Sequence, residues 1–345
     1  MNARVDRLRE GLEEPLLVTD PTNVRYLTGL ASSNAALLVE PERLRLFTDF
    51  RYAERARLLD GVEVVQTSRA LVRDLADVLV GRVGFEAAHV TYAGWETLAA
   101  GAGELVPRRG SVERLRAVKD EGELDAIRAA TAVTNRAYER MAQERFVGRT
   151  ERELAWRMAE LLHEEGADGL AFETIVAAGA NGARPHALPG DAFVEPGQTV
   201  VVDAGAQLRG YNSDCTRTFA TGELPDRLRK AYEVCRDAQQ QALGRVCAGA
   251  NGQEVDGFTR ELIDATEFRG AFGHGLGHGV GLLVHEAPNL RQEEAPTLEA
   301  GNVVTVEPGV YLEGLGGIRI EDLVVVTDGE PEILTSFPKE LVTVD

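Results

Sequence analysis

Two apolar, strand-like segments of the 345-residue chain each carry a pair of carboxylates placed about a turn. In "VVVDAGAQLRGYNSDCTRT", Asp203 and Asp214 flank a turn signal at 208–210. In "VEPGVYLEGLGGIRIEDL", Glu307 and Glu321 have their midpoint at Gly314. An antiparallel hairpin folded at each turn would set the two acids of a pair roughly opposite each other. The pattern therefore predicts two hairpins that each hold two facing negative charges.

Such pairs need positive charge nearby. Like charges directly opposite each other destabilise a sheet, and an unpaired carboxylate among apolar residues costs roughly several kcal/mol in desolvation. An arginine, or a solvated hairpin end, would explain one pair taken alone. Two pairs favour two divalent metal ions, which would match the four negative charges. Oxygen-rich ligation favours Mn²⁺, with Co²⁺, Zn²⁺ and Fe²⁺ as alternatives, and two ions about 3.5–4 Å apart can hold a bridging hydroxide and polarise a carbonyl, as hydrolysis requires.

Three of the chain's six histidines fall in one glycine-rich stretch, "AFGHGLGHGVGLLVHEAP" at 271–288. His278 is the candidate metal ligand, and His274 and His285 are candidate hydrogen-bond donors to a developing oxyanion. Its glycines are expected to let a substrate approach the backbone closely. The stretch does not match HExxH or GxxxxGK, which excludes a helical zincin site and a phosphate-binding loop of that type.

Composition and charge exclude several other classes of protein. The net charge of −19 repels phosphate backbones and anionic membranes, so neither nucleic acid nor a membrane is an expected partner. No apolar run approaches the roughly 20 residues that span a bilayer. The amino terminus is charged and unlike a secretory signal, and the three cysteines show no CxxC spacing. We therefore expect a cytoplasmic protein.

The pattern of elements changes near Ser111. Before it, short apolar runs alternate with amphipathic patterns at 52–59 and 71–80, which predicts a small α/β domain. After it, helical patterns at 111–143 and 150–166 precede strands, and further helices precede strands again, as in a duplicated α+β unit. Thr150 and Glu153 match a capping box. We expect an amino-terminal domain over 1–112 and a second domain over 113–345.

The same segments resemble the metallopeptidases with the pita-bread fold, in particular their Xaa-Pro branch of prolidases and aminopeptidases P. The resemblance covers essentially the whole chain. Besides the strings quoted above, "LRAVKDEGELDAIRAA" resembles the helix that opens the catalytic half, and "TNVRYLTGL" and "TDFRYAERA" resemble the amino-terminal domain of creatinases and prolidases. It implies a pita-bread catalytic domain, built of duplicated helix and antiparallel-sheet halves, after a smaller creatinase-like α/β domain.

The resemblance also implies roles for particular residues. It implies a dinuclear metal centre, in which Asp214 and Glu321 bridge the ions; the ligands are Asp203, Asp214, His278, Glu307 and Glu321. Glu307 would also carry a proton for the attacking hydroxide. The resemblance places His186 in the active site and gives Arg319 the role of holding a ligand in place. His89 and His163 are expected to be structural.

The implied reaction is cleavage of the bond before proline in dipeptides, as in prolidases, with aminopeptidase P acting on longer peptides as the alternative. Some prolidases have an arginine where this chain has Asn289. The candidates for binding the substrate carboxylate are therefore other arginines: Arg45, Arg51, Arg184 and Arg291. The intact ligand set disfavours a non-catalytic binding module and a creatinase-like relative, and the motif spacing disfavours a methionine aminopeptidase. The resemblance also implies a homodimer.

Overall fold

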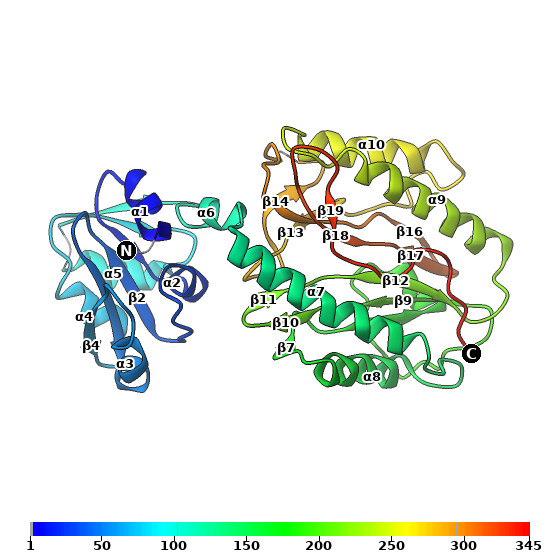
Figure 1. Ribbon diagram of the computed structural model, residues 1–345, viewed down its shortest axis with the longest axis horizontal. Coiled ribbons are helices and arrows are strands. Elements are labelled where there is room, and N and C mark those ends of the chain that lie inside the picture. The colour runs from blue at the N-terminus through cyan, green and yellow to red at the C-terminus, as the bar shows by residue number, and fades with distance from the viewer. Residues whose placement is uncertain (1–2, 102, 294) are drawn as a thin grey trace. The chain divides into compact units, whose positions relative to one another are not determined.

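The computed structural model describes residues 3–101, 103–293 and 295–345. The chain divides between Arg116 and Ala117 into two compact units, and each is described by itself (Figure 1). In the described part of the chain, no helix combines the length and the apolar character needed to cross a membrane.

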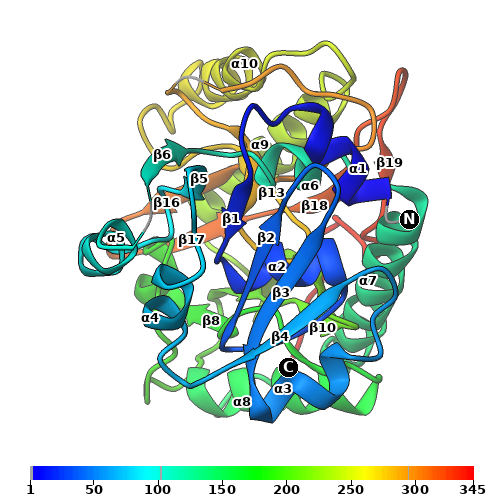
Figure 2. The ribbon, with the colours of Figure 1, turned by 90° about the vertical axis from the view of Figure 1, so that its left-hand side faces the viewer.

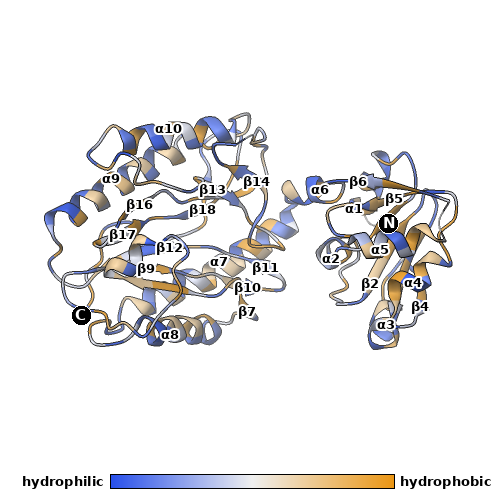
Figure 3. Ribbon diagram, turned by 180° about the vertical axis from the view of Figure 1, so that it is seen from behind, coloured by the Kyte–Doolittle hydropathy of each residue, from blue (hydrophilic) through white to orange (hydrophobic). Residues whose placement is uncertain are grey.

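The amino-terminal unit is built on a mixed six-stranded sheet in the order β4-β3-β2-β1-β5-β6 (Figure 2). Its strands are β1 (Leu16–Val18), β2 (Ala35–Val39), β3 (Leu44–Asp49), β4 (Glu63–Thr67), β5 (Arg82–Glu86) and β6 (Glu104–Arg108). Strand β1 pairs antiparallel with β2 and parallel with β5. Apolar strands run through the interior of this unit (Figure 3), and its core includes the buried side chains of Leu17, Leu38, Phe47 and Phe85.

Short helices precede, connect and follow these strands. They are α1 (Ala3–Glu10), α2 (Pro21–Thr28), α3 (Phe50–Ala56), α4 (Leu71–Ala76), α5 (Tyr92–Ala99) and α6 (Glu113–Ala117). Local signals fix their ends: α2 begins where the Asp20 side chain accepts from two backbone N–H groups, and it ends at Gly29 with a φ of 79°. The expectation of a small α/β domain is confirmed.

The carboxyl-terminal unit contains two rounds of a helix pair followed by antiparallel strands. Its helices are α7 (Glu121–Met141), α8 (Glu151–Glu164), α9 (Asp226–Leu243) and α10 (Gly252–Asp264). In Figure 1 the strands lie between α7 and α8 on one side and α9 and α10 on the other. This is the duplicated α+β arrangement expected of the pita-bread fold.

The strands of this unit form several small sheets. The first round gives β12-β9-β8 and β11-β10-β7, and the second gives β14-β13-β15-β18-β19 and the pair β16-β17. Their bounds in chain order are β7 (Gly169–Leu170), β8 (Ile175–Ala178), β9 (Thr199–Asp203), β10 (Ala206–Leu208), β11 (Tyr211–Asn212), β12 (Thr216–Ala220), β13 (Gly277–Gly279), β14 (Glu286–Leu290), β15 (Val303–Val306), β16 (Gly309–Leu312), β17 (Gly316–Arg319), β18 (Asp322–Val325) and β19 (Glu332–Ile333).

Capping residues explain where helices α7 and α8 of this unit begin. The capping box predicted at Thr150 and Glu153 is present at the start of α8. The long helical pattern over 111–143 does not form one helix, because the helical conformation is interrupted between α6 and α7. Asp120 caps α7 and forms a capping box with Glu123, while the Lys119 N–H donates to Gly301 O at 2.9 Å instead of to a helical carbonyl.

Candidate metal centre and substrate cavity

The first hairpin has a different register from the one predicted. Strand β9 ends at Asp203, whose direct partner on β12 is Thr216, not Asp214. The turn lies at Arg209 and Gly210, with φ angles of 52° and 87°, and Leu208 pairs with Tyr211. Since Asp214 lies two residues before Thr216, it is the diagonal neighbour of Asp203 on the same face. The two acids, expected roughly opposite each other, therefore lie on the same face but two residues apart in register.

The second hairpin has the predicted register. Val306 pairs with Asp322 on β15 and β18, and Gly309 pairs with Arg319 on β16 and β17. The same register on both sides sets Glu307 across from Glu321, in the gap between these strand pairs. The two hairpins are joined edge to edge, because the Glu321 N–H donates to Thr216 O at 3.2 Å.

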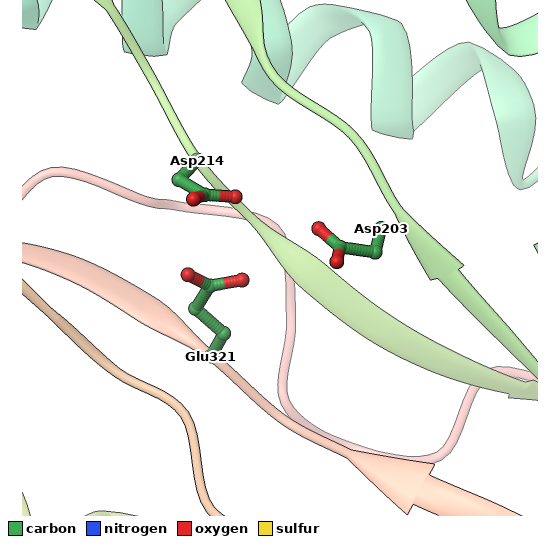
Figure 4. A group of neighbouring side chains, drawn as sticks. All are labelled: Asp203, Asp214 and Glu321. Carbon is green, nitrogen blue, oxygen red and sulfur yellow. The ribbon is translucent and has the colours of Figure 1, made fainter. Parts of the chain in front are cut away.

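These hairpins bring the carboxylates together. Oxygen atoms of Asp203, Asp214 and Glu321 lie within 4.8 Å of one another, and Figure 4 shows the three side chains pointing toward a common point. His278, on β13, links Glu307 to these three carboxylates. Its Nε2 lies 3.7 Å from Asp214 Oδ2 and 3.3 Å from Glu307 Oε1. All five residues expected as metal ligands thus lie in one cluster.

The acids of this cluster strongly perturb one another. Burial, reinforced by the charge of neighbouring carboxylates, raises the pKa of Asp214 and of Glu321 well above the ordinary range. Burial also raises the pKa of Asp203, with Arg319 opposing it. For Glu307 the hydrogen bond from His278 and the charges of His278 and His274 outweigh burial and lower the pKa to about 2.

The cluster is chemically suited to a bound cation. Among the described residues, Asp203 Oδ1 is a buried oxygen with no hydrogen-bond partner, although buried polar atoms in proteins are nearly always paired. Four carboxylates and one imidazole form an oxygen-rich donor set that divalent metals accept. A pair of such ions would neutralise the mutual repulsion that raises these pKa values.

Arg319 contacts the cluster through a hydrogen bond to Asp203. Its side chain is buried, donates to Asp203 Oδ2 at 2.7 Å and to Thr216 Oγ1 at 3.0 Å, and is therefore no surface arginine. It also donates to the hydroxyl of Tyr311 at 3.0 Å. Tyr311 was missed by the sequence analysis, although the two-residue period of a strand places it on the same face as Glu307.

The three candidate hydrogen-bonding histidines differ in what they can do. His274 Nδ1 lies 2.8 Å from Gly275 O and its Nε2 lies 2.8 Å from the Tyr311 hydroxyl, so both ring nitrogens are engaged. His285 is exposed, and its ring meets that of His278 edge-on, with centroids 4.2 Å apart. His186 is exposed on the cavity wall. The structure thus leaves His285 and His186 better placed than His274 to meet a ligand.

All five residues of the cluster line a cavity of about 440 Å³. Phe172, Ile175 and Pro185 give the cavity an apolar wall, and the remaining lining residues include Asn289, Arg291 and Glu293. Of the arginines considered for a substrate carboxylate, Arg291 lines this cavity.

Two of the other candidate arginines are engaged elsewhere in the amino-terminal unit. Arg45 contacts Glu40 and Arg51 contacts Asp49. Arg184 is exposed and is not among the cavity-lining residues.

The glycines of the histidine stretch allow close packing within the protein. A Cβ atom on Gly277 would lie 2.0 Å from Thr305 O, and one on Gly279 would lie 2.4 Å from Ala287 O. Gly275 and Gly277 also line the cavity, and the close approach of a substrate to this backbone stays a prediction. Gly273 has open space where its Cβ would be.

Comparisons with known proteins agree with the fold. Residues 125–328 match the metallopeptidase family M24, and residues 4–118 match the creatinase/prolidase N-terminal domain. The chain belongs to metallopeptidase family M24 and carries the creatinase/prolidase type of amino-terminal domain. It is a hydrolase of the prolidase branch, and its family implies a pair of divalent metal ions.

Individual relatives cover nearly all of the chain. An uncharacterized peptidase, YqhT, of Bacillus subtilis is 36% identical over 334 residues, which are 95% of each chain. The solved structure of an Xaa-Pro dipeptidase from Bacillus anthracis matches with a TM-score of 0.94 at 33% identity over 99% of both chains. That of an X-Pro aminopeptidase from Thermotoga maritima matches with a TM-score of 0.90 at 33% identity, over 99% of this chain and 100% of the other.

Proposed function

We propose that this protein is an Xaa-Pro dipeptidase that uses two divalent metal ions, with Mn²⁺ as the first candidate. The observation that carries the proposal is the buried carboxylate cluster, with the unpartnered Asp203 oxygen, in the lining of a cavity. Asp203, Asp214, His278, Glu307 and Glu321 would hold the ions, with Asp214 and Glu321 shared between them. Bound ions would polarise the substrate carbonyl and lower the pKa of a water molecule.

The surrounding residues would bind the substrate and move protons. Glu307, whose Oε1 lies 3.3 Å from His278 Nε2 beside the cluster, would accept a proton from the attacking water and pass it toward the proline nitrogen. His285 and His186 would donate hydrogen bonds to the oxygen on which negative charge develops. Arg319 would keep the Asp203 carboxylate in its orientation. Tyr311 would keep the ring of His274 in its orientation.

The cavity supports a small substrate. Its volume of about 440 Å³ is near the lower end of the range of ~300–1,000 Å³ for small-ligand sites. The apolar wall of Phe172, Ile175 and Pro185 suits a proline ring or an apolar side chain. Relatives include both a named dipeptidase and a named aminopeptidase, so aminopeptidase P activity on longer peptides is the second candidate function.

A comparison of substrate lengths tests the proposal. The protein, loaded with Mn²⁺, would be given an Xaa-Pro dipeptide, the matching Xaa-Pro-Yaa tripeptide and a dipeptide without proline. We expect cleavage of the Xaa-Pro dipeptide alone. Preferential cleavage of the tripeptide would establish the aminopeptidase instead, and no cleavage of any proline peptide with two bound ions would overturn both.

Three further assignments belong to the proposal. The division into an amino-terminal domain over 1–112 and a catalytic domain over 113–345 stays a prediction, which limited proteolysis would test. The homodimer is tested by light scattering at micromolar concentration. A cytoplasmic location is tested by cell fractionation.

A further inference from the structure

The segment that leads into β13 is held from helix α10 through its backbone. Arg260 donates from Nη1 to Phe272 O at 2.5 Å and from Nη2 to His274 O at 2.8 Å. Asp256 Oδ1 accepts from the Leu276 N–H at 2.9 Å. Two side chains of one helix thus satisfy backbone groups of three alternate residues, as a neighbouring strand would.

The two side chains form an ion pair buried beneath the segment. Arg260 Nη2 lies 3.1 Å from Asp256 Oδ1. The Asp256 side chain is fully buried and that of Arg260 is only 16% exposed. The guanidinium also stacks over the Phe272 ring at 4.4 Å, and that ring meets His274 edge-on at 5.1 Å. Both the backbone and the ring of His274 therefore rest on structure fixed by this pair.

The segment held by Asp256 and Arg260 is also hydrogen-bonded to the backbone of Glu307. Leu276, whose N–H is held by Asp256, accepts a hydrogen bond at its carbonyl oxygen from the Glu307 N–H at 2.8 Å. One peptide segment thus links helix α10 to a proposed metal ligand. Glycines at 273 and 275 give this segment many alternative conformations, which an external anchor must exclude.

We propose that Asp256 and Arg260 are positioning residues that hold His274 and Glu307 in their working geometry. This inference rests on the proposed function, because the working geometry is that of the peptidase site. Neither residue lines the cavity, so the pair acts only through the segment 272–276. Displacement of a catalytic group by about 1 Å can lower turnover about 100-fold.

The test combines kinetics with a spectroscopic signal from His274. Variant Arg260→Met would be compared with Arg157→Met, which removes an arginine of similar burial on α8 that contacts Glu144 and lies in no proposed site. Protein labelled at histidine Cε1 and loaded with diamagnetic Zn²⁺ gives one NMR signal for each of six histidines. The signal lost in His274→Gln identifies His274.

For Arg260→Met we expect kcat on the Xaa-Pro dipeptide to fall about 10- to 100-fold, with KM changed by less than about threefold because the cavity is untouched. The His274 signal should shift or broaden, while those of His89 and His163 stay in place. Arg157→Met should lower the unfolding temperature without changing kcat or the His274 signal.

A merely structural ion pair would give a different result. If Arg260→Met is less stable, yet keeps wild-type kcat and an unchanged His274 signal, the proposal is overturned. Should that variant fail to fold because Asp256 is left unpaired, the double variant Asp256→Asn/Arg260→Met removes the buried charge and serves the same comparison. If the wild type cleaves no Xaa-Pro peptide, the proposed function fails. The His274 signal would still test whether Asp256 and Arg260 hold the segment 272–276 in place.

Discussion

Arg319 donates to one oxygen of Asp203 at 2.7 Å, while the other oxygen of that carboxylate is buried without a hydrogen-bond partner in the described structure. The guanidinium therefore fixes the direction in which the free oxygen points. Carboxylate ligands held in this way bind metals more tightly, because their orientation costs nothing on binding.

Replacing Arg319 by methionine should weaken metal binding. We expect a 10- to 100-fold loss of Mn²⁺ affinity, about the cost of losing an outer-sphere partner, measured by calorimetric titration of the chelated protein. Arg319→Lys keeps the charge but loses the forked geometry, so its Mn²⁺ affinity should lie between those of the wild type and Arg319→Met. An affinity for Mn²⁺ within twofold of wild type in Arg319→Met, roughly the precision of the titration, would contradict this role.

Removing one shared ligand should abolish activity. Asp214→Asn is expected to leave less than two equivalents of bound metal by elemental analysis and no hydrolysis at any added Mn²⁺ concentration, because a neutral amide cannot replace a bridging carboxylate. Asp226→Asn, an exposed acid at the start of α9, is the control and should behave as wild type. Full turnover by Asp214→Asn would show that this cluster is not the catalyst.

The sequence predicts one hairpin better than the other for a physical reason. Gly314 marks the turn of the second hairpin and adopts a φ of 74°, a conformation that glycine reaches without strain. In the first hairpin a non-glycine residue, Arg209, takes up a φ of 52°. Few non-glycine residues do so. The predicted turn at 208–210 contains both turn residues, but Asp203 and Asp214 are two residues out of register because the turn is centred between Arg209 and Gly210.

Contacts of the site through the backbone were also invisible in the sequence. Asp256 and Arg260 are four residues apart on one helix, a spacing that usually indicates a solvent-exposed ion pair. Their burial beneath the histidine segment depends on how α10 packs, which one helical pattern cannot reveal. In the same way, the spacing of the histidines does not show that Tyr311 engages His274.

Glycine at 277 should be required for stability. The missing Cβ leaves room for Thr305 O, which would lie 2.0 Å away, so we expect Gly277→Ala to reduce the free energy of unfolding by about 3 kcal/mol. Gly273→Ala, where a Cβ meets nothing within 4 Å, should change it by less than about 0.5 kcal/mol. Urea denaturation measures both. Equal losses for the two variants would mean that conformational freedom, not close packing, explains these glycines.

The buried ring of His274 should make stability depend on pH. Burial lowers the pKa of His274 from its ordinary value, with the charge of Glu307 opposing this. Between the lowered pKa and the unfolded value of about 6.5, the unfolded chain binds more protons at His274 than the folded one. The contribution of the neutral His274 ring to the free energy of unfolding is therefore fully present above about pH 6.5 and is lost as pH falls. The cluster carboxylates titrate in both proteins, so the comparison is the difference in urea midpoint between wild type and His274→Gln, each chelated. We expect that difference to move against the wild type from pH 7 to pH 5. A difference that stays constant over this range would show that His274 accepts a proton as readily in the fold as outside it.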